Sequence, residues 1–174
     1  MTSQQGSLDL LQEPVAQNLL QSRIPARFAY RWTDGTPRLI PIGFHWNGEE
    51  IVLGTPVDAP KLKALRDGQS VALCIDTNDM PYKVLEIRGT VRLDEVEGVA
   101  PEYEQMTLRT LGDEAGRAWL TYLAPICPRM ARVFISPQWV ALLDFETRFP
   151  SALERAMEAA SAAPQNAGDA RGRL

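Results

Sequence analysis

The chain has 174 residues, of which 45% are apolar and 23% are charged, and its formal net charge at pH 7 is −4. This length and composition suit one soluble globular domain with a substantial core. The net negative charge and scattered basic residues argue against non-specific nucleic-acid binding, and no apolar run approaches the roughly 20 residues that would span a bilayer.

Apolar periodicity and turn residues predict the elements in chain order. The expected strands cover residues 28–32, 38–46, 51–55, 71–76, 82–93, 129–135 and 139–145. The expected helices cover residues 8–22 (interrupted at Pro14), 58–65, 95–123 (split at Gly112-Asp113) and 150–161. Asp34-Gly35 and Asn47-Gly48 are turn dipeptides, and the second gives the strongest hairpin signal.

Many strands, few helices and tight turns predict a mainly β protein with flanking helices, built as a six- to seven-stranded antiparallel barrel. We expect one domain over residues 1–161, with the barrel over about 26–145. The tail over 162–174 is rich in Ala, Gly and polar residues and is expected to be disordered.

The strand over 38–46 has two distinct faces. Ile40, Ile42, Phe44 and Trp46 share the apolar face, and Leu39, Pro41, Gly43 and His45 share the other. The second face has room for a flat ligand or for another subunit. His45 is accordingly a candidate substrate contact, with an interface or core histidine as the alternative.

Lys61 is expected in the first turn of the helix over 58–65, with Asp58 as its N-cap. A helix start favours phosphate, a lysine adds a full charge, and the hydroxyl of Thr55 can donate a hydrogen bond. The alternative is a solvated lysine, and the Asp58 carboxylate competes for the same donors.

Two further residues are candidate ligand contacts. Strict alternation places Lys83 beside apolar Leu85 and Ile87, so it needs a partner, an edge exit or a ligand. Trp139 begins the last strand among apolar neighbours, where core packing is the alternative.

Several site classes are not supported. His45 is the only histidine, which excludes a metal site with two histidines in one chain. Neither a nucleophile elbow nor a glycine-rich nucleotide-binding loop is present. Cys74 and Cys127 lack a CxxC partner, and no leader pattern is found, so we expect a reducing, cytoplasmic location.

Together these segments resemble the pyridoxamine 5′-phosphate oxidase-like split-barrel flavoproteins. The resembling segments are 34–37, 38–46, 53–56, 59–65, 71–76, 87–90 and 139–150. The resemblance implies a split β-barrel homodimer with a flavin mononucleotide (FMN) cleft between subunits. It implies phosphate contacts from Lys61 and Thr55 and a ring lying along Pro41, Ile42 and Gly43, and the ring would be flanked by Trp139, with His45 or Lys83 as a polar contact.

The chain departs from the true oxidases at positions that matter. Ala59-Pro60 stands where they have Ser-Arg, and Ile40 and His45 replace an Arg and a Lys. These departures argue against vitamin B6 oxidation. We therefore expect a flavin-binding oxidoreductase acting on a small molecule.

Two alternatives of the same fold remain open. One is a deazaflavin-dependent reductase, with Lys63, Arg66 and Arg129 available for an acidic tail. The other is a non-enzymatic flavin- or haem-binding dimer, in which His45 is the only candidate axial ligand.

Overall fold

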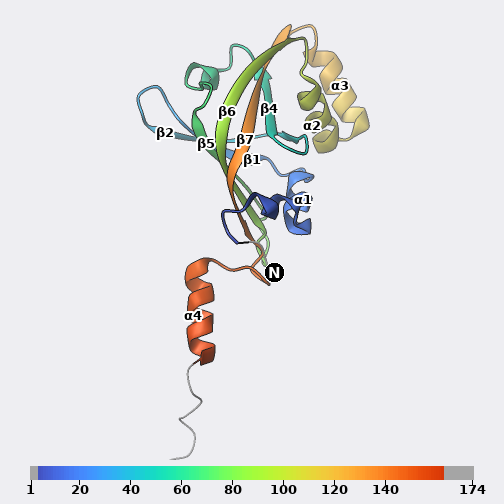
Figure 1. Ribbon diagram of the computed structural model, residues 1–174. Helices are drawn as coiled ribbons and strands as arrows, with labels where there is room; N and C mark the ends of the chain where they lie inside the picture. The colour runs from blue at the N-terminus through green and yellow to red at the C-terminus, as the bar shows by residue number, and fades with distance from the viewer. Residues whose placement is uncertain (1–3, 163–174) are drawn as a thin grey trace, which may run out of the picture.

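The computed structural model describes residues 4–162 and contains one sheet of seven strands (Figure 1). The strands are β1 Ala26–Arg31, β2 Pro37–Ile42, β3 His45–Trp46, β4 Ile51–Pro56, β5 Ser70–Asp76, β6 Val84–Glu97 and β7 Arg129–Leu143. Their order in the sheet is β2-β1-β5-β6-β7-β4-β3, and every neighbouring pair is antiparallel. The predicted mainly β, antiparallel architecture is confirmed.

The sheet must curl because of one short connection. β2 and β3 lie at opposite edges of the sheet, yet only Gly43 and Phe44 separate them in the chain. Three Cα–Cα steps hold Ile42 and His45 within about 11 Å of each other. The sheet therefore forms a barrel that stays unpaired between β2 and β3, as expected of a split barrel. The prediction of one continuous strand over 38–46 is wrong. The chain leaves the β2 edge of the sheet at Gly43 and joins the opposite edge as β3.

β6 and β7 form the longest ladder of the barrel. β7 is one strand, not the predicted pair over 129–135 and 139–145. The register shifts so that Trp139 lies opposite Arg88 while Pro137 lies opposite Gly89, which leaves Gln138 as the extra residue of a bulge. A bulge tolerates the missing N–H of proline, so the strand continues through Pro137.

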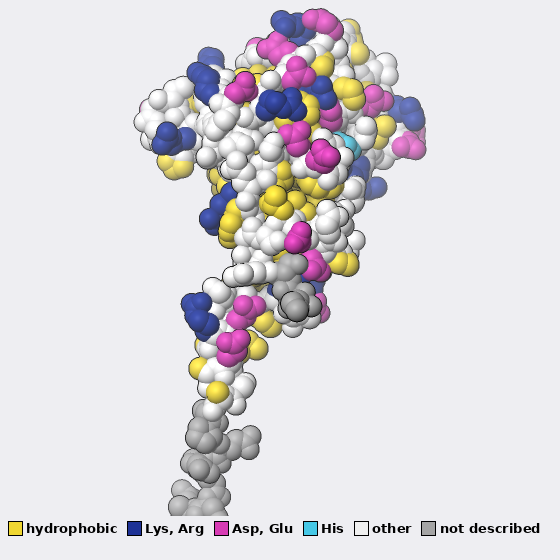
Figure 2. Space-filling model, in the orientation of Figure 1, with side chains coloured by type: hydrophobic (Ala, Val, Ile, Leu, Met, Phe, Trp, Pro, Cys, Tyr) yellow, Lys and Arg dark blue, Asp and Glu magenta, His cyan; other side chains and the backbone are white. Residues whose placement is uncertain are grey.

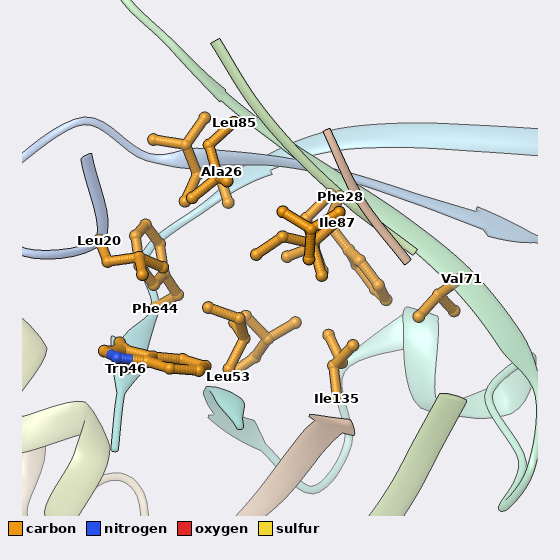
Figure 3. Packing of buried hydrophobic residues seen from close by; sticks show 14 of the residues in the cluster. Leu20, Ala26, Phe28, Phe44, Trp46, Leu53, Val71, Leu85, Ile87 and Ile135 are labelled. Atoms are coloured by element: carbon orange, nitrogen blue, oxygen red, sulfur yellow. The ribbon is translucent and has the colours of Figure 1, made fainter. Parts of the chain in front are cut away.

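The barrel interior is filled by one face of each strand. Ile87 and Ile135 are fully buried between their flanking outward residues, as the predicted alternation requires. Figure 3 shows side chains from several strands and the N-terminal region converging there: Leu20, Ala26, Phe28, Phe44, Trp46, Leu53, Val71, Leu85, Ile87 and Ile135. The apolar face predicted for 40–46 points into this core, and Phe44 and Trp46 are buried.

Helices cover the barrel outside this core. The N-terminal segment forms a 3₁₀-helix, η1 Leu8–Gln12, and then α1 Pro14–Leu20, which agrees with the expected interruption at Pro14. Between β6 and β7 lie α2 Pro101–Leu111 and α3 Asp113–Leu123. They split at Gly112 as predicted, where φ is +84°. They begin later than residue 95, because β6 extends to Glu97.

The segment after β4 differs from the prediction. The expected α-helix over 58–65 is a four-residue 3₁₀-helix, η2 Pro60–Lys63, and its N-cap is Ala59 rather than Asp58. The loop that follows is fastened to β6, since Gly68 N donates to Val91 O at 2.8 Å and Leu93 N donates to Asp67 Oδ1 at 2.7 Å. Within the segment itself, Leu62 N donates to Ala59 O and Ala64 N donates to Lys61 O, which is the 3₁₀ pattern.

The C-terminal segment leaves the barrel through a tight loop. Asp144 Oδ1 accepts hydrogen bonds from the backbone N–H groups of Glu146, Thr147 and Arg148 at 2.7–2.9 Å. These bonds hold the pKa of the Asp144 carboxyl well below its usual range, although burial opposes them. The helix α4 Ser151–Ala162 then projects away from the barrel with no buried residue (Figure 1). The tail expected to be disordered lies, apart from Ala162, outside the described residues.

The surface carries mixed charge. On the face in Figure 2, basic and acidic side chains are interleaved over the upper part of the barrel, and neither sign forms a large patch. None of the helices in the described part of the chain combines the length and apolar character needed to cross a membrane.

The bulge gives a stability prediction. A Cβ on Gly89 would overlap the backbone carbonyl oxygen of Ser136 on β7. Because this contact is with backbone, we expect Gly89→Ala to lower the unfolding free energy by about 2 kcal/mol or more. Urea denaturation measures the change. Ser70→Ala, at an exposed position of β5, is the control and should stay within about 0.5 kcal/mol of the parent. An equal effect of both substitutions would contradict the bulge explanation.

Candidate functional site

A cavity of about 390 Å³ lies at the split of the barrel, beside the connection from β2 to β3. Its walls come from the segment before β1, the end of β2, Gly54 of β4 and one face of α2. Pro41, Ile42 and Gly43 line it, as predicted for a ligand site, because β2 ends here without a strand partner on its outer edge. The missing strand pairing leaves this edge open to a ligand or to another chain.

α2 approaches the barrel at two glycines. A Cβ on Gly43 would lie 2.5 Å from Sδ of Met106, and one on Gly54 would lie 2.7 Å from Cβ of Tyr103. A larger residue at Gly54 would meet Cβ of Tyr103 and push α2 outward, whereas one at Gly43 would displace the flexible side chain of Met106. Gly54 therefore determines how closely α2 closes over the cavity.

Two buried nitrogen atoms have no hydrogen-bond partner, one on the cavity-lining residue Arg109 and one on His45, the residue after the lining residue Phe44. They are Nδ1 of His45 and Nε of Arg109, and they are the only such side-chain atoms among residues 4–162. Arg109 uses another nitrogen, Nη2, to donate to the carbonyl oxygen of Phe44. Buried polar groups are nearly always paired in folded proteins, so these two atoms make the region around Arg109 and His45 a candidate site for a ligand.

The electrostatic balance of the cavity favours an anion or an electron-rich edge. Its lining contains Arg23 and Arg109 and no carboxylate. The nearby carboxylate of Glu102 is paired with Arg132, whose Nε lies 3.0 Å from Oε2. Burial would raise the pKa of Glu102, but its hydrogen bond with Arg132 and backbone bonding lower it overall. Glu102 is thus ionised and already neutralised, which leaves the charge of Arg109 uncompensated.

His45 is neutral in this setting. Burial lowers its pKa below 6.5, the positive charge of Arg109 lowers it further, and Glu102 opposes the shift. In the neutral tautomer protonated at Nε2, Nδ1 of His45 accepts a hydrogen bond, while Arg109 Nε–H donates one. In that tautomer the two atoms offer one acceptor and one donor.

The other predicted site residues do not line this cavity. Thr55 is buried and, by alternation with Leu53, faces the barrel interior. Lys61 is half-buried on η2, and burial lowers its pKa. No carboxylate lies within ion-pair distance of Lys61 in the described part of the chain. On the neighbouring side of η2, an open hollow is lined by Asp58, Lys63, Asp94 and Glu95, among others, and is too acidic for phosphate.

Lys83 and Trp139 have partners within the chain. Lys83 forms an ion pair with Glu146, and its Nζ donates to the carbonyl oxygen of Asp144 at 3.3 Å, which satisfies the need for a partner seen in the sequence. The guanidinium carbon of Arg88 lies 3.9 Å from the ring centroid of Trp139, and a Cβ on Gly6 would lie 2.9 Å from the indole nitrogen.

The basic residues proposed for an acidic cofactor tail differ in availability. Arg129 is paired with Glu95 and Glu97, and Arg66 donates to the carbonyl oxygens of Leu65 and Leu62. Lys63 and Arg66 are both exposed without a carboxylate partner in the described residues, so Arg129 alone of the three is ion-paired.

A second, open groove of about 640 Å³ lies over the outer face of β1, β5 and β6. Small side chains, including Ala29 and Ala72, form its floor, and Arg88 and Gln138 lie at its border. Gln138 is the residue before Trp139, so this groove adjoins the tryptophan predicted to flank a ring.

Sequence reasoning missed the contribution of α2. Met106, Tyr103 and Arg109 were not candidates, because a helical pattern identifies an amphipathic face without showing which strand edge it meets. Tyr103, Met106 and Thr110 have the i, i+3, i+7 spacing of one helix face, which was the only available signal.

No protein-family model matches the chain, and no curated protein matches it. Solved structures do match. A protein named F420 reductase has 24% identity and a TM-score of 0.54 and covers 72% of this chain and 94% of its own. HutZ, the heme storage protein from Vibrio cholerae, has 17% identity and a TM-score of 0.54, with coverages of 75% and 93%.

A third structure is a protein from Listeria innocua provisionally named pyridoxamine 5′-phosphate oxidase. It has 17% identity and a TM-score of 0.52 and covers 77% of this chain and 98% of its own. These matches confirm the resemblance to the oxidase-like split barrels at the level of the fold.

The single histidine allows a direct electrostatic test. We expect His45 to titrate below 6.5 in an NMR pH series. Because its folded pKa lies below the unfolded value, the neutral form is favoured by folding, and the contribution of His45 to stability is lost as pH falls below about 6.5.

Two variants separate the causes of this shift. Arg109→Gln should raise the pKa of His45 toward 6.5, and Glu102→Gln should lower it further. A His45 pKa above 6.5 in the parent, or no response to Arg109→Gln, would contradict the proposed environment.

Proposed function

We propose that this protein is a homodimeric oxidoreductase of the split-barrel fold that binds a flavin-type cofactor, FMN in the first instance, at the cavity between β2 and α2. One observation carries the proposal: Arg109, which lines the cavity together with Pro41, Ile42 and Gly43, has a buried Nε–H without a partner, and Nδ1 of His45, the residue after the lining residue Phe44, is also buried without a partner. The pyrimidine edge of a flavin carries both N–H and carbonyl groups. It therefore complements an acceptor beside a donor.

The residues of this chain would bind and orient the cofactor. The backbone from Pro41 to Gly43 would support the flat ring, and Arg109 would place positive charge at its electron-rich edge. Lys61 is half-buried without a carboxylate partner, so a phosphate would offset the cost of burying its charge. When bound, the flavin supplies the hydride chemistry, which requires no protein nucleophile.

A second subunit would complete the site. Lys83 and Trp139 do not line the cavity of their own chain, and the resemblance expects a cofactor cleft between subunits. The groove over Ala29 and Ala72 has a smooth, small-residue floor that a partner's surface can cover. This arrangement would bring the border residues Arg88 and Gln138 of one chain toward the cavity of the other.

The proposal is tested by titrating the protein with FMN, the deazaflavin F420 and haem, followed by fluorescence or absorbance. We expect FMN to bind best. Arg109→Gln should weaken FMN binding about tenfold, because a hydrogen bond to a charged donor contributes at least 1.4 kcal/mol. Arg155→Gln, at an exposed position of α4, is the matched control and should change affinity less than about twofold. The proposal would be contradicted if none of the three cofactors bound at a concentration of about 100 µM.

The deazaflavin alternative is favoured by the F420 reductase match, which has the highest identity of the three structures described above. The acidic tail of a deazaflavin needs basic residues at the cavity mouth, and Arg129 is already paired with Glu95 and Glu97. We therefore expect FMN to bind more tightly than the deazaflavin. Tighter binding of F420 than of FMN in the same titration would reverse the order.

A substitution of Lys61 distinguishes a cofactor-binding enzyme from a barrel that has lost its phosphate contact. We expect Lys61→Ala to weaken FMN binding about tenfold and to leave binding of lumichrome, the ring without ribityl phosphate, unchanged. Lys63→Ala, on the same 3₁₀ turn but exposed, is the control and should bind both ligands like the parent. Equal FMN affinity in the Lys61→Ala variant and the parent would favour the non-enzymatic alternative.

A further inference from the structure

Met106 occupies the space directly above the β2–β3 connection. A Cβ on Gly43 would lie 2.5 Å from Sδ, 3.0 Å from Cε and 3.2 Å from Cγ of Met106. The thioether therefore rests on the bare backbone of Gly43. Thr110 holds it there from the next turn of α2, with its hydroxyl 3.8 Å from the sulfur.

Glycine at this position is explained by space and not by backbone conformation. Gly43 is not among the glycines with positive φ, which include Gly35 and Gly48 in the predicted turns. Because Gly43 has no side chain, Met106 or a ligand can lie directly against its backbone.

A planar ligand and Met106 compete for the same place. The cavity is lined by both Met106 and the Pro41–Gly43 backbone. A ring lying flat on that backbone must enter the space above Gly43, which the thioether fills. The orphaned Nε of Arg109, a lining residue, stays available to the polar edge of such a ring when Met106 moves.

We infer that Met106 sets which ring systems the cavity admits, by covering Gly43 until a planar ligand displaces it. This inference rests on the proposed function and names the residue that determines its specificity. Methionine suits the role, because three rotatable bonds and a polarisable sulfur let it swing aside and then pack against an aromatic ring. The displacement lowers the apparent affinity of the parent protein, since only the fraction with Met106 displaced can bind.

The first test compares ring binding in matched variants. Met106→Ala removes the cover, and we expect it to bind both FMN and lumichrome about fivefold tighter than the parent, or more. Met106→Leu keeps the volume and should stay within about twofold. Met157→Ala removes an exposed methionine on α4 and should bind like the parent.

The second test uses the parent protein and does not depend on any truncated variant. The chain has five methionines, so ¹³C-methyl labelling gives a small set of signals, and Met106→Leu assigns the one from Met106. Saturation with FMN should shift the Met106 methyl signal through the ring current of the flavin, and the Met157 signal should stay in place. A Met106 signal that does not move on FMN saturation would overturn the inference even if Met106→Ala does not fold.

The outcomes separate this inference from the proposed function. FMN binding by the parent with no gain in Met106→Ala overturns the role of Met106 and leaves the proposed function standing. Binding by Met106→Ala alone supports the role of Met106 and overturns flavin binding by the native chain. Failure of both proteins to bind FMN and lumichrome overturns both.

Discussion

The short connection from β2 to β3 is the constraint on which the rest of the structure depends. Two residues, Gly43 and Phe44, join strands at opposite edges of a seven-stranded sheet. The sheet can satisfy this only by curling, and curling buries Phe44 in the barrel while leaving Gly43 at the surface of the split. The position of the cavity thus follows from chain connectivity, and side chains only define its chemistry.

The same constraint explains why α2 bears on function. An unpaired strand end exposes backbone groups that need cover, and α2 covers them by seating Tyr103 and Met106 on Gly54 and Gly43. In doing so it carries Arg109 to the carbonyl oxygen of Phe44, where its charge is buried without a carboxylate. The docking of α2 therefore both covers the split and makes the cavity electropositive.

A feature of this fold could be predicted from the sequence when it depends only on residues close together in the chain. The hairpin at Asn47-Gly48, the break at Gly112 and the inward alternation around Ile87 all follow from short-range rules, and the structure confirms them. The break at Gly43 and the continuity of β7 through Pro137 depend on which strands pair. A strand pattern does not report a change of partner, because alternation continues across the break.

The candidate site was predictable only where it lies on a strand. Pro41, Ile42 and Gly43 could be identified from face alternation and from a resemblance, and they line the cavity. Arg109 and Met106 could not be identified, because they belong to a helix whose docking partner is some 60 residues away in the chain. Lys61 remains a prediction. The helix expected around it is only four residues long, which removes most of the helix-terminus donors that the phosphate argument used.

The short helix at Lys61 changes how much the phosphate end and the ring end of the proposed flavin would each contribute to binding. With a short 3₁₀ turn and with Ala59-Pro60 in place of a donor and a cation, the phosphate end retains one half-buried lysine. The ring end gains Nε of the half-buried Arg109 and Nδ1 of a neutral His45, two atoms without a hydrogen-bond partner. On binding, the ring would supply partners for two buried nitrogen atoms, whereas the phosphate would meet one half-buried lysine. Ring recognition would therefore dominate the affinity, and a cavity of this kind discriminates among cofactors by the hydrogen-bonding edge of the ring more than by the charge of its tail.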